Sequence, residues 1–216
     1  MTDQQKRKSL QRLSFFVVIF VILLDQATKI WVKTNMELSE EFSVFGDWFY
    51  IHFTENNGMA FGMEIAGDYG KLILSLFRIV AVSLIGWYLY KLPSKGATKG
   101  LMISGALIFA GALGNIIDSA FYGLIFNDSY YQTATLFPDE GGYAPFLFGR
   151  VVDMLYFPLY EGFLPEDLPI WGGKYFIFFR PVFNIADAAI SIGVVSVLLF
   201  HRSFFSDKKE AEEAEV

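Results

Sequence analysis

The chain has 216 residues, of which 54% are hydrophobic and 18% aromatic, and its formal net charge is −6 at pH 7. Apolar residues gather in blocks long enough to cross a bilayer, which indicates a single membrane-embedded domain spanning residues 1–216 rather than a soluble protein. The absence of cysteine excludes disulfides, thiolate nucleophiles and cysteine-ligated metals, and the acidic balance implies no nucleic-acid partner.

Four apolar segments are predicted to cross the membrane as helices, at about residues 13–32, 72–92, 101–117 and 182–200. The first follows a basic stretch and resembles the opening of a secretory signal. Because no small-x-small cleavage site follows it, we interpret this segment as an uncleaved span. The predicted fold is therefore mainly α-helical, a four-helix transmembrane bundle.

The distribution of basic residues predicts the orientation of the bundle. Lysine and arginine concentrate before the first span, between the second and third spans, and after the fourth. The positive-inside rule places these regions in the cytoplasm, so both termini are expected to face the cytoplasm. Residues 33–70 and 118–180 are then extracytoplasmic, and residues 206–216 are expected to form a disordered acidic tail.

The two extracytoplasmic connections differ in how clearly they can be interpreted. Residues 42–53 are aromatic and β-prone, broken by a Gly-Asp turn signal, which predicts a small sheet at the outer surface. Residues 127–142 are polar, and residues 156–173 contain three prolines. We therefore expect a second extracytoplasmic region of loops, with a short helix at most, that could act as a lid.

Polar side chains collect near the outer ends of the predicted spans. Asn56 precedes the second span, and three further pairs share a spacing of three or four residues, which places both members on one helix face: Asp25 with Lys29, Asn115 with Asp118, and Asn184 with Asp187. We expect these faces to turn inward and form a polar cluster just below the outer surface. Small residues in the third span allow the helices to approach closely: Gly105, Gly111 and Gly114.

Asp187 places a carboxylate at the start of the last apolar segment. A charge inside a span costs about 3 kcal/mol on insertion scales, so such an acid usually has a function and a partner. The best partner is Asp153, which ends the sequence GRVVD. Two carboxylates a few ångströms apart can divide the general-base and general-acid roles, because like charges cannot easily both ionise. The pair therefore predicts an aspartyl protease centre.

Structural roles stay open for several of these residues. Lys29 could extend to the headgroups or pair with Asp25, and Arg78 could do the same with an acid of the cluster. Asn115 and Asn184 could simply hydrogen-bond between helices. At the level of function, a small proton-coupled carrier or a non-catalytic membrane assembly factor are the alternatives. A carrier would place polar residues along the whole depth of the bundle.

Five motifs, in this order, resemble those of the bacterial lipoprotein signal peptidases, the type II signal peptidases: DQATK at 25–29, NNGMAF at 56–61, GALGNIID at 111–118, GRVVD at 149–153 and FNIAD at 183–187. Each motif is weak by itself. Together they cover most of the chain and make the resemblance specific.

The resemblance implies an aspartic endopeptidase of the bacterial inner membrane with its active site at the periplasmic face. Its substrate would be a diacylglyceryl-modified prolipoprotein, and it would contact membrane lipid and bind globomycin-type cyclic peptide inhibitors. We expect no cofactor and a monomer. The family's catalytic acids correspond to Asp153 and Asp187. Its supporting residues correspond to Asp25, Lys29, Asn56, Gly58, Asn115, Asp118 and Asn184.

Two departures from the family pattern affect the site. Ser119 follows Asp118 where the family usually has an arginine, and the chain between Ala120 and Phe148 is much longer than in the compact form of the family. We hypothesise that Arg150 or Arg78 supplies the missing positive charge.

Overall fold

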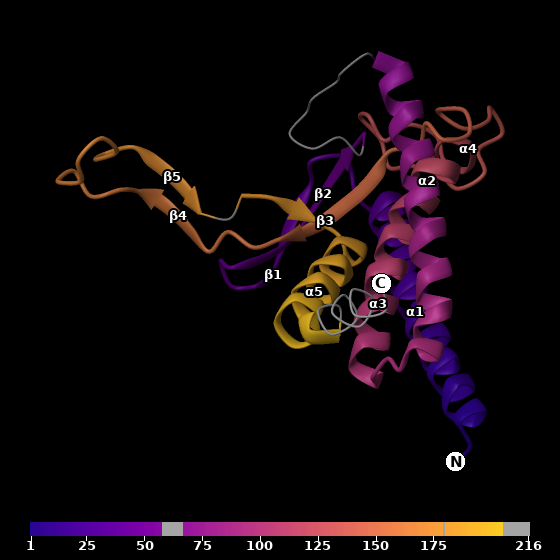
Figure 1. Ribbon diagram of the computed structural model, residues 1–216. Helices are drawn as coiled ribbons and strands as arrows, with labels where there is room; N and C mark the ends of the chain where they lie inside the picture. The colour runs from indigo at the N-terminus through magenta and orange to yellow at the C-terminus, as the bar shows by residue number, and fades with distance from the viewer. Residues whose placement is uncertain (58–66, 179, 205–216) are drawn as a thin grey trace.

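The computed structural model describes residues 1–57, 67–178 and 180–204, so Gly58 and the predicted acidic tail lie outside the described residues. The protein is mainly helical, as predicted, with α1 (Asp3–Asn35), α2 (Gly67–Lys91), α3 (Lys99–Ile117) and α5 (Ile185–Phe200) forming a bundle (Figure 1). Among the described residues, three helices are long and apolar enough to cross a membrane. The fourth predicted span stays a prediction, because α5 has only 16 residues.

Local sequence signals explain where the helices begin and end. α1 begins earlier than predicted because Thr2 forms a capping box with Gln5, which makes the basic stretch helical as well. The short connection between α2 and α3 is a 3₁₀ turn, η2 (Leu92–Lys95), closed by Gly96 at a φ of 81°. α5 begins at Ile185 rather than 182, because Asn184 caps it and the two residues before it form a strand.

α3 is the central helix and packs against α1, α2 and α5. Its small-residue face makes this possible: Ala106 and Ala110 are fully buried, and a Cβ added at Gly111 would lie 2.2 Å from the backbone oxygen of Ala186. The backbones of α3 and α5 therefore approach as closely as the glycine pattern predicts. Beyond Ile117 the helix continues through one π-helical turn, η3 (Asp118–Tyr122), into the short α4 (Gly123–Ile125).

A four-stranded antiparallel sheet covers one end of the bundle, in the order β1-β2-β3-β6. The sheet predicted in the first connection is confirmed as β1 (Glu41–Phe45) and β2 (Phe49–Asn56). The second connection adds β3 (Val151–Tyr156) and β6 (Val182–Phe183), so Asp153 lies on a strand and not in a loop. The loop expectation was wrong here, because β3 gains its ladder from a partner strand about 100 residues earlier in the chain.

A second correction concerns residues 156–173, which were expected to form loops. β4 (Tyr160–Phe163) and β5 (Tyr175–Phe178) pair as a hairpin that extends away from the bundle (Figure 1). Pro165 and Pro169 lie between the two strands, where no ladder hydrogen bond is needed. The prolines therefore mark the hairpin connection and do not prevent pairing.

The glycine face of α3 generates a stability prediction. Gly111→Ala should destabilise the protein by about 1–3 kcal/mol, because the new methyl group would meet the backbone of α5. Gly105→Ala is the matched control in the same helix: its Cβ would lie 3.0 Å from the Cδ1 atom of Leu89, which can rotate away. Thermal unfolding in detergent measures both, and equal stability of the two variants would contradict the packing described here.

Candidate active site

Asp153 lies in the middle of β3, opposite Thr54 of β2, and only 4% of its surface is exposed to solvent. Its two carboxylate oxygens accept hydrogen bonds from different elements. Asn184 Nδ2 donates to Oδ1 at 2.7 Å, and the amide of Asn56, at the end of β2, donates to Oδ2. The strand pairing therefore fixes the position of Asp153, and two amides fix the orientation of its side chain.

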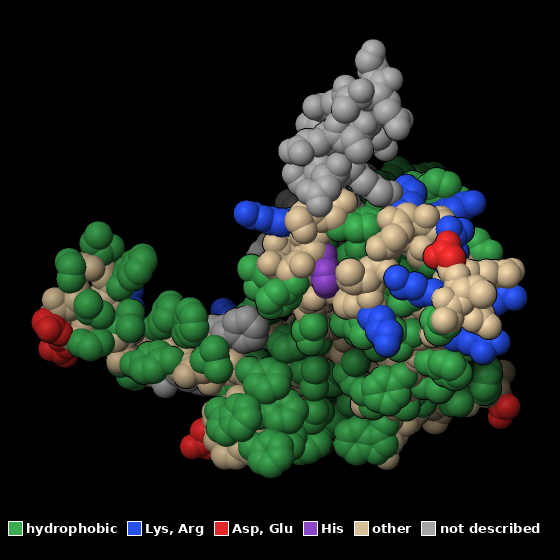
Figure 2. Space-filling model, turned by 60° about the horizontal axis from the view of Figure 1, so that its bottom comes forward, with side chains coloured by type: hydrophobic (Ala, Val, Ile, Leu, Met, Phe, Trp, Pro, Cys, Tyr) green, Lys and Arg blue, Asp and Glu red, His purple; other side chains and the backbone are tan. Residues whose placement is uncertain are grey.

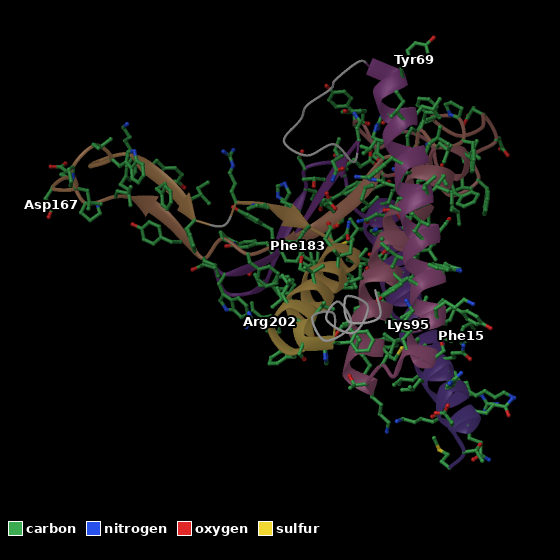
Figure 3. All side chains as sticks on the ribbon, viewed as in Figure 1. Phe15, Tyr69, Lys95, Asp167, Phe183 and Arg202 are labelled. Carbon is green, nitrogen blue, oxygen red and sulfur yellow. The ribbon has the colours of Figure 1, made fainter. Side chains whose placement is uncertain are left out.

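Asp187 lies in the first turn of α5, where it forms a capping box with Asn184. Its backbone N–H donates to Asn184 Oδ1 at 2.8 Å, and the Asn184 N–H donates to Asp187 Oδ2 at 3.3 Å. Asn115 of α3 donates from Nδ2 to Asp187 Oδ1 at 2.8 Å. The residues that begin the helix thus also position its carboxylate, and β6, where Phe183 is labelled, leads directly into this turn (Figure 3).

Asn184 connects the two acids. Its Nδ2 atom donates to Asp153 and also, at 3.1 Å, to Asn115 Oδ1, while Asn115 donates to Asp187. The structure therefore brings together five of the predicted site residues: Asp153, Asp187, Asn56, Asn115 and Asn184. Asn115 and Asn184 thus hydrogen-bond between elements, and through the same contacts they hold the two carboxylates.

The environment of Asp153 favours its protonated form. Burial and, secondarily, the nearby charge of Asp187 raise the pKa of Asp153 to about 7, against the opposing effect of the hydrogen bonds from Asn184 and Asn56. Asp153 can therefore carry a proton near neutral pH. This arrangement can supply an acid and a base at the same time.

Lys29 forms a fully buried ion-pair triad with Asp25 and Asp118. Its Nζ atom lies 2.9 Å from Asp25 Oδ2 and 2.8 Å from Asp118 Oδ2, and it donates to Asn115 Oδ1 at 2.9 Å. All three charged side chains are at most 1% exposed. Lys29 thus points into the bundle and does not extend to the headgroups.

The acids of the triad also contact the elements that carry the site. Asp25 Oδ1 accepts from the backbone N–H of Ala186 at 2.9 Å, and Asp118 Oδ2 accepts from the N–H of Val152 at 3.4 Å. Gln26, which the sequence reasoning did not single out, donates to Asp118 Oδ1 at 2.9 Å. Its place next to Asp25 in the DQATK motif was the available signal.

The guanidinium of Arg150 pairs with two acids other than Asp118. It donates to Glu55 at 3.0 Å and to both carboxylate oxygens of Asp128, at 3.1 and 3.2 Å, and it lies over the ring of Tyr143 at 4.7 Å. The positive charge beside Asp118 comes instead from Lys29. Glu55, Asp128 and Arg150 form a second charged cluster, which attaches the long segment after α4 to β2.

Two further charged residues, Arg78 and Glu55, lie near the acid pair or its contacts. Arg78 of α2 interacts electrostatically with Asp187. Glu55, which also pairs with the buried Lys33, was not predicted as a site residue. It directly precedes Asn56, so the second cluster lies one residue along β2 from a contact of Asp153.

The chain matches the family described as signal peptidase (SPase) II over residues 17–205. A lipoprotein signal peptidase of Porphyromonas gingivalis is 52% identical over 184 residues, which cover 85% of this chain and 80% of that protein. One of Amoebophilus asiaticus is 35% identical over 201 residues, covering 92% and 81%. A solved bacterial membrane enzyme, determined by the in meso method at 1.9 Å, is similar with a TM-score of 0.56 and 26% identity, over 87% of this chain and 93% of that one.

The buried triad generates a second prediction. Lys29→Met should destabilise the protein by about 3–5 kcal/mol, because it leaves Asp25 and Asp118 buried without a cation. Arg7→Met is the control in the same helix, since Arg7 pairs with Asp3 at the same spacing but in solvent, where a pair contributes about 0–1 kcal/mol. Thermal unfolding of both variants in detergent measures the difference. Similar losses of stability would contradict a structural role for the triad.

Proposed function

The chain belongs to the signal peptidase II family, and we propose that it cleaves the signal peptides of diacylglyceryl-modified prolipoproteins with Asp153 and Asp187 as its catalytic acids. Membership of this family supports a protease that acts on prolipoproteins. The observation that carries the aspartic mechanism is the pair of carboxylates joined through Asn184 and Asn115, with a raised pKa at Asp153.

In the proposed reaction, Asp153 carries the proton and Asp187 is the ionised member. Asp187 accepts a proton from a water molecule, whose oxygen adds to the carbonyl carbon of the scissile peptide bond. Asp153 donates a hydrogen bond to the developing oxyanion and then its proton to the leaving nitrogen, and the C–N bond breaks. The pair again holds one proton, now the one taken from water, so the cycle needs no covalent intermediate and no cofactor.

The remaining polar residues would act by holding the two acids in place. Asn56, Asn115 and Asn184 orient the carboxylates, and the triad of Asp25, Lys29 and Asp118 fixes the helices that carry them. By the family resemblance we also assign a role to Gly58 in contacting the substrate. Arg150 would support the site indirectly, by fixing β2 next to Asn56.

The protein is a multi-pass membrane protein, and we place it in the bacterial inner membrane with both termini in the cytoplasm. Figure 2 brings forward the end of the molecule that carries the N-terminus in Figure 1, and Lys and Arg side chains gather on this face, which supports the orientation. The two acids would then lie at the periplasmic face, where a signal-peptide helix can enter between spans while the acyl chains of the substrate stay in lipid. Globomycin-type cyclic peptides would bind at the same place as the signal peptide, and the enzyme would act as a monomer.

The position of the polar network favours a peptidase over a proton-coupled carrier. A carrier would place its polar site near the middle of the bundle. Here the hydrogen bonds between Asp153, Asp187 and the asparagines form where the helices meet the sheet, and β2 and β3 contribute directly to them.

A third prediction tests the assignment of the acids. Asp153→Asn and Asp187→Asn should each lower cleavage of a lipidated precursor in detergent by about 10²–10⁴-fold, the usual contribution of general acid–base catalysis. Asp167→Asn, at the far end of the β4–β5 hairpin (Figure 3), is the control and should leave cleavage unchanged. Full activity in either dyad variant, with its folding verified, would refute the aspartic mechanism.

A fourth prediction concerns pH. Because the reaction needs one protonated acid and the pKa of Asp153 is raised to about 7, kcat/KM should fall as the pH rises through about 7. Cleavage rates between about pH 5 and pH 9 measure this fall. A rate that keeps rising across the neutral and alkaline range would be incompatible with a shared proton.

A further inference from the structure

The end of the bundle opposite the acid pair carries a groove between α1 and α2. Both helices pack against α3, but they diverge from one another, and the space between them has a volume of about 250 Å³. Its walls include Val18 of α1 and Leu89 of α2, and Met102 and Phe109 of α3 form its floor. Three helices therefore form the walls and floor of the groove.

Toward the N-terminus the groove opens into a wider hollow of about 600 Å³. Gln11, Phe15 and Tyr90 line both spaces, so the two lie next to each other. The hollow is also lined by the cations Lys8 and Arg12. Figure 3 shows Phe15 on the side of α1 that faces away from α5, where lipid would have access.

The chemistry of the groove changes along its length. The hollow presents two positive charges, whereas the inner part is apolar apart from Gln11 and Ser14. The Ser14 hydroxyl donates to the backbone oxygen of Leu10 at 3.2 Å, and the Gln11 side-chain amide donates to the backbone carbonyl oxygen of Tyr90 at 3.4 Å. These polar groups thus have partners within the protein, which leaves charge at the mouth and hydrocarbon surface inside.

We propose that this groove binds one anionic glycerophospholipid, with its phosphate at Lys8 and Arg12 and one acyl chain between α1 and α2. From Lys8 to Val18 the helix rises by about 15 Å, which equals half of a hydrocarbon core of about 30 Å. The groove therefore has the length of one leaflet. Basic pockets between transmembrane helices on the cytoplasmic side are suited to anionic headgroups.

The proposal commits to an anionic lipid because other occupants would use only part of the site. Inorganic phosphate would leave the apolar groove empty, and a zwitterionic lipid would bring a positive group of its own to a site that already holds two cations. By comparison, an apolar hollow of about 350 Å³ between α2, α3 and α5 has no charged residue among its lining residues in the described part of the chain. The site is independent of the proposed peptidase function, since it lies at the other end of the bundle.

Native mass spectrometry of the full-length protein tests the proposal, with dioleoyl phosphatidylglycerol and dioleoyl phosphatidylcholine as probes of equal chain length. We expect one phosphatidylglycerol to bind at least tenfold more tightly than phosphatidylcholine. The double variant Lys8→Ala, Arg12→Ala should remove this preference. Lys6→Ala, Arg7→Ala changes the net charge equally but alters residues outside the groove lining, and it should keep the preference.

A second variant tests the acyl-chain part of the site. Val18→Phe should weaken phosphatidylglycerol binding several-fold while leaving both cations in place, because the larger ring fills the groove. If this variant does not fold, the comparison of the two double variants still decides the question. Equal binding of both lipids, equal losses in the two double variants, or displacement of the lipid by millimolar inorganic phosphate would overturn the proposal.

Discussion

The burial of Lys29 between Asp25 and Asp118 is the interaction on which the rest of the site depends. A lysine in this position must be paired, because an uncompensated buried charge is strongly destabilising. One acid would be enough to neutralise Lys29. The presence of two acids lets each of them also bind the backbone of another element. Asp25 binds the backbone at the start of α5, and Asp118 binds the backbone of β3. The triad therefore joins the helices to the two elements that carry Asp187 and Asp153, and it sets the distance between them.

In the hydrogen-bond network the asparagines lie between Lys29 and the two carboxylates, and burial raises the pKa of Asp153 to about 7. Lys29 donates to Asn115 Oδ1, and Asn115 in turn donates to Asp187. The ammonium group of Lys29 is therefore connected to Asp187 through the Asn115 amide. Asn184 likewise connects Asp187 with Asp153. An ammonium group at the position of either amide would favour two ionised acids, which is incompatible with the proposed division into an acid and a base.

Much of this site could be predicted from sequence because its residues lie on helices, where a spacing of three or four residues fixes a shared face. Asn115, Asp118, Asn184 and Asp187 were found in that way. The strand carrying Asp153 could not be found from local pattern, since its ladder depends on β2 far away in the chain. The pairing of Arg150 with Glu55 and Asp128 was missed for the same reason: three distant segments bring these charges together, and the GRVVD motif that contains Arg150 does not indicate its two partners.

The central claim is that Asp153 and Asp187 share a proton, and infrared difference spectroscopy of ¹³C-aspartate-labelled protein measures this directly. The carboxylic acid band of Asp153, assigned by its absence in Asp153→Asn, should titrate in the native protein near pH 7. In Asp187→Asn the midpoint should be lower, because one cause of the raised pKa has been removed. An unchanged midpoint in that variant, or a native band already absent at acidic pH, would contradict the account.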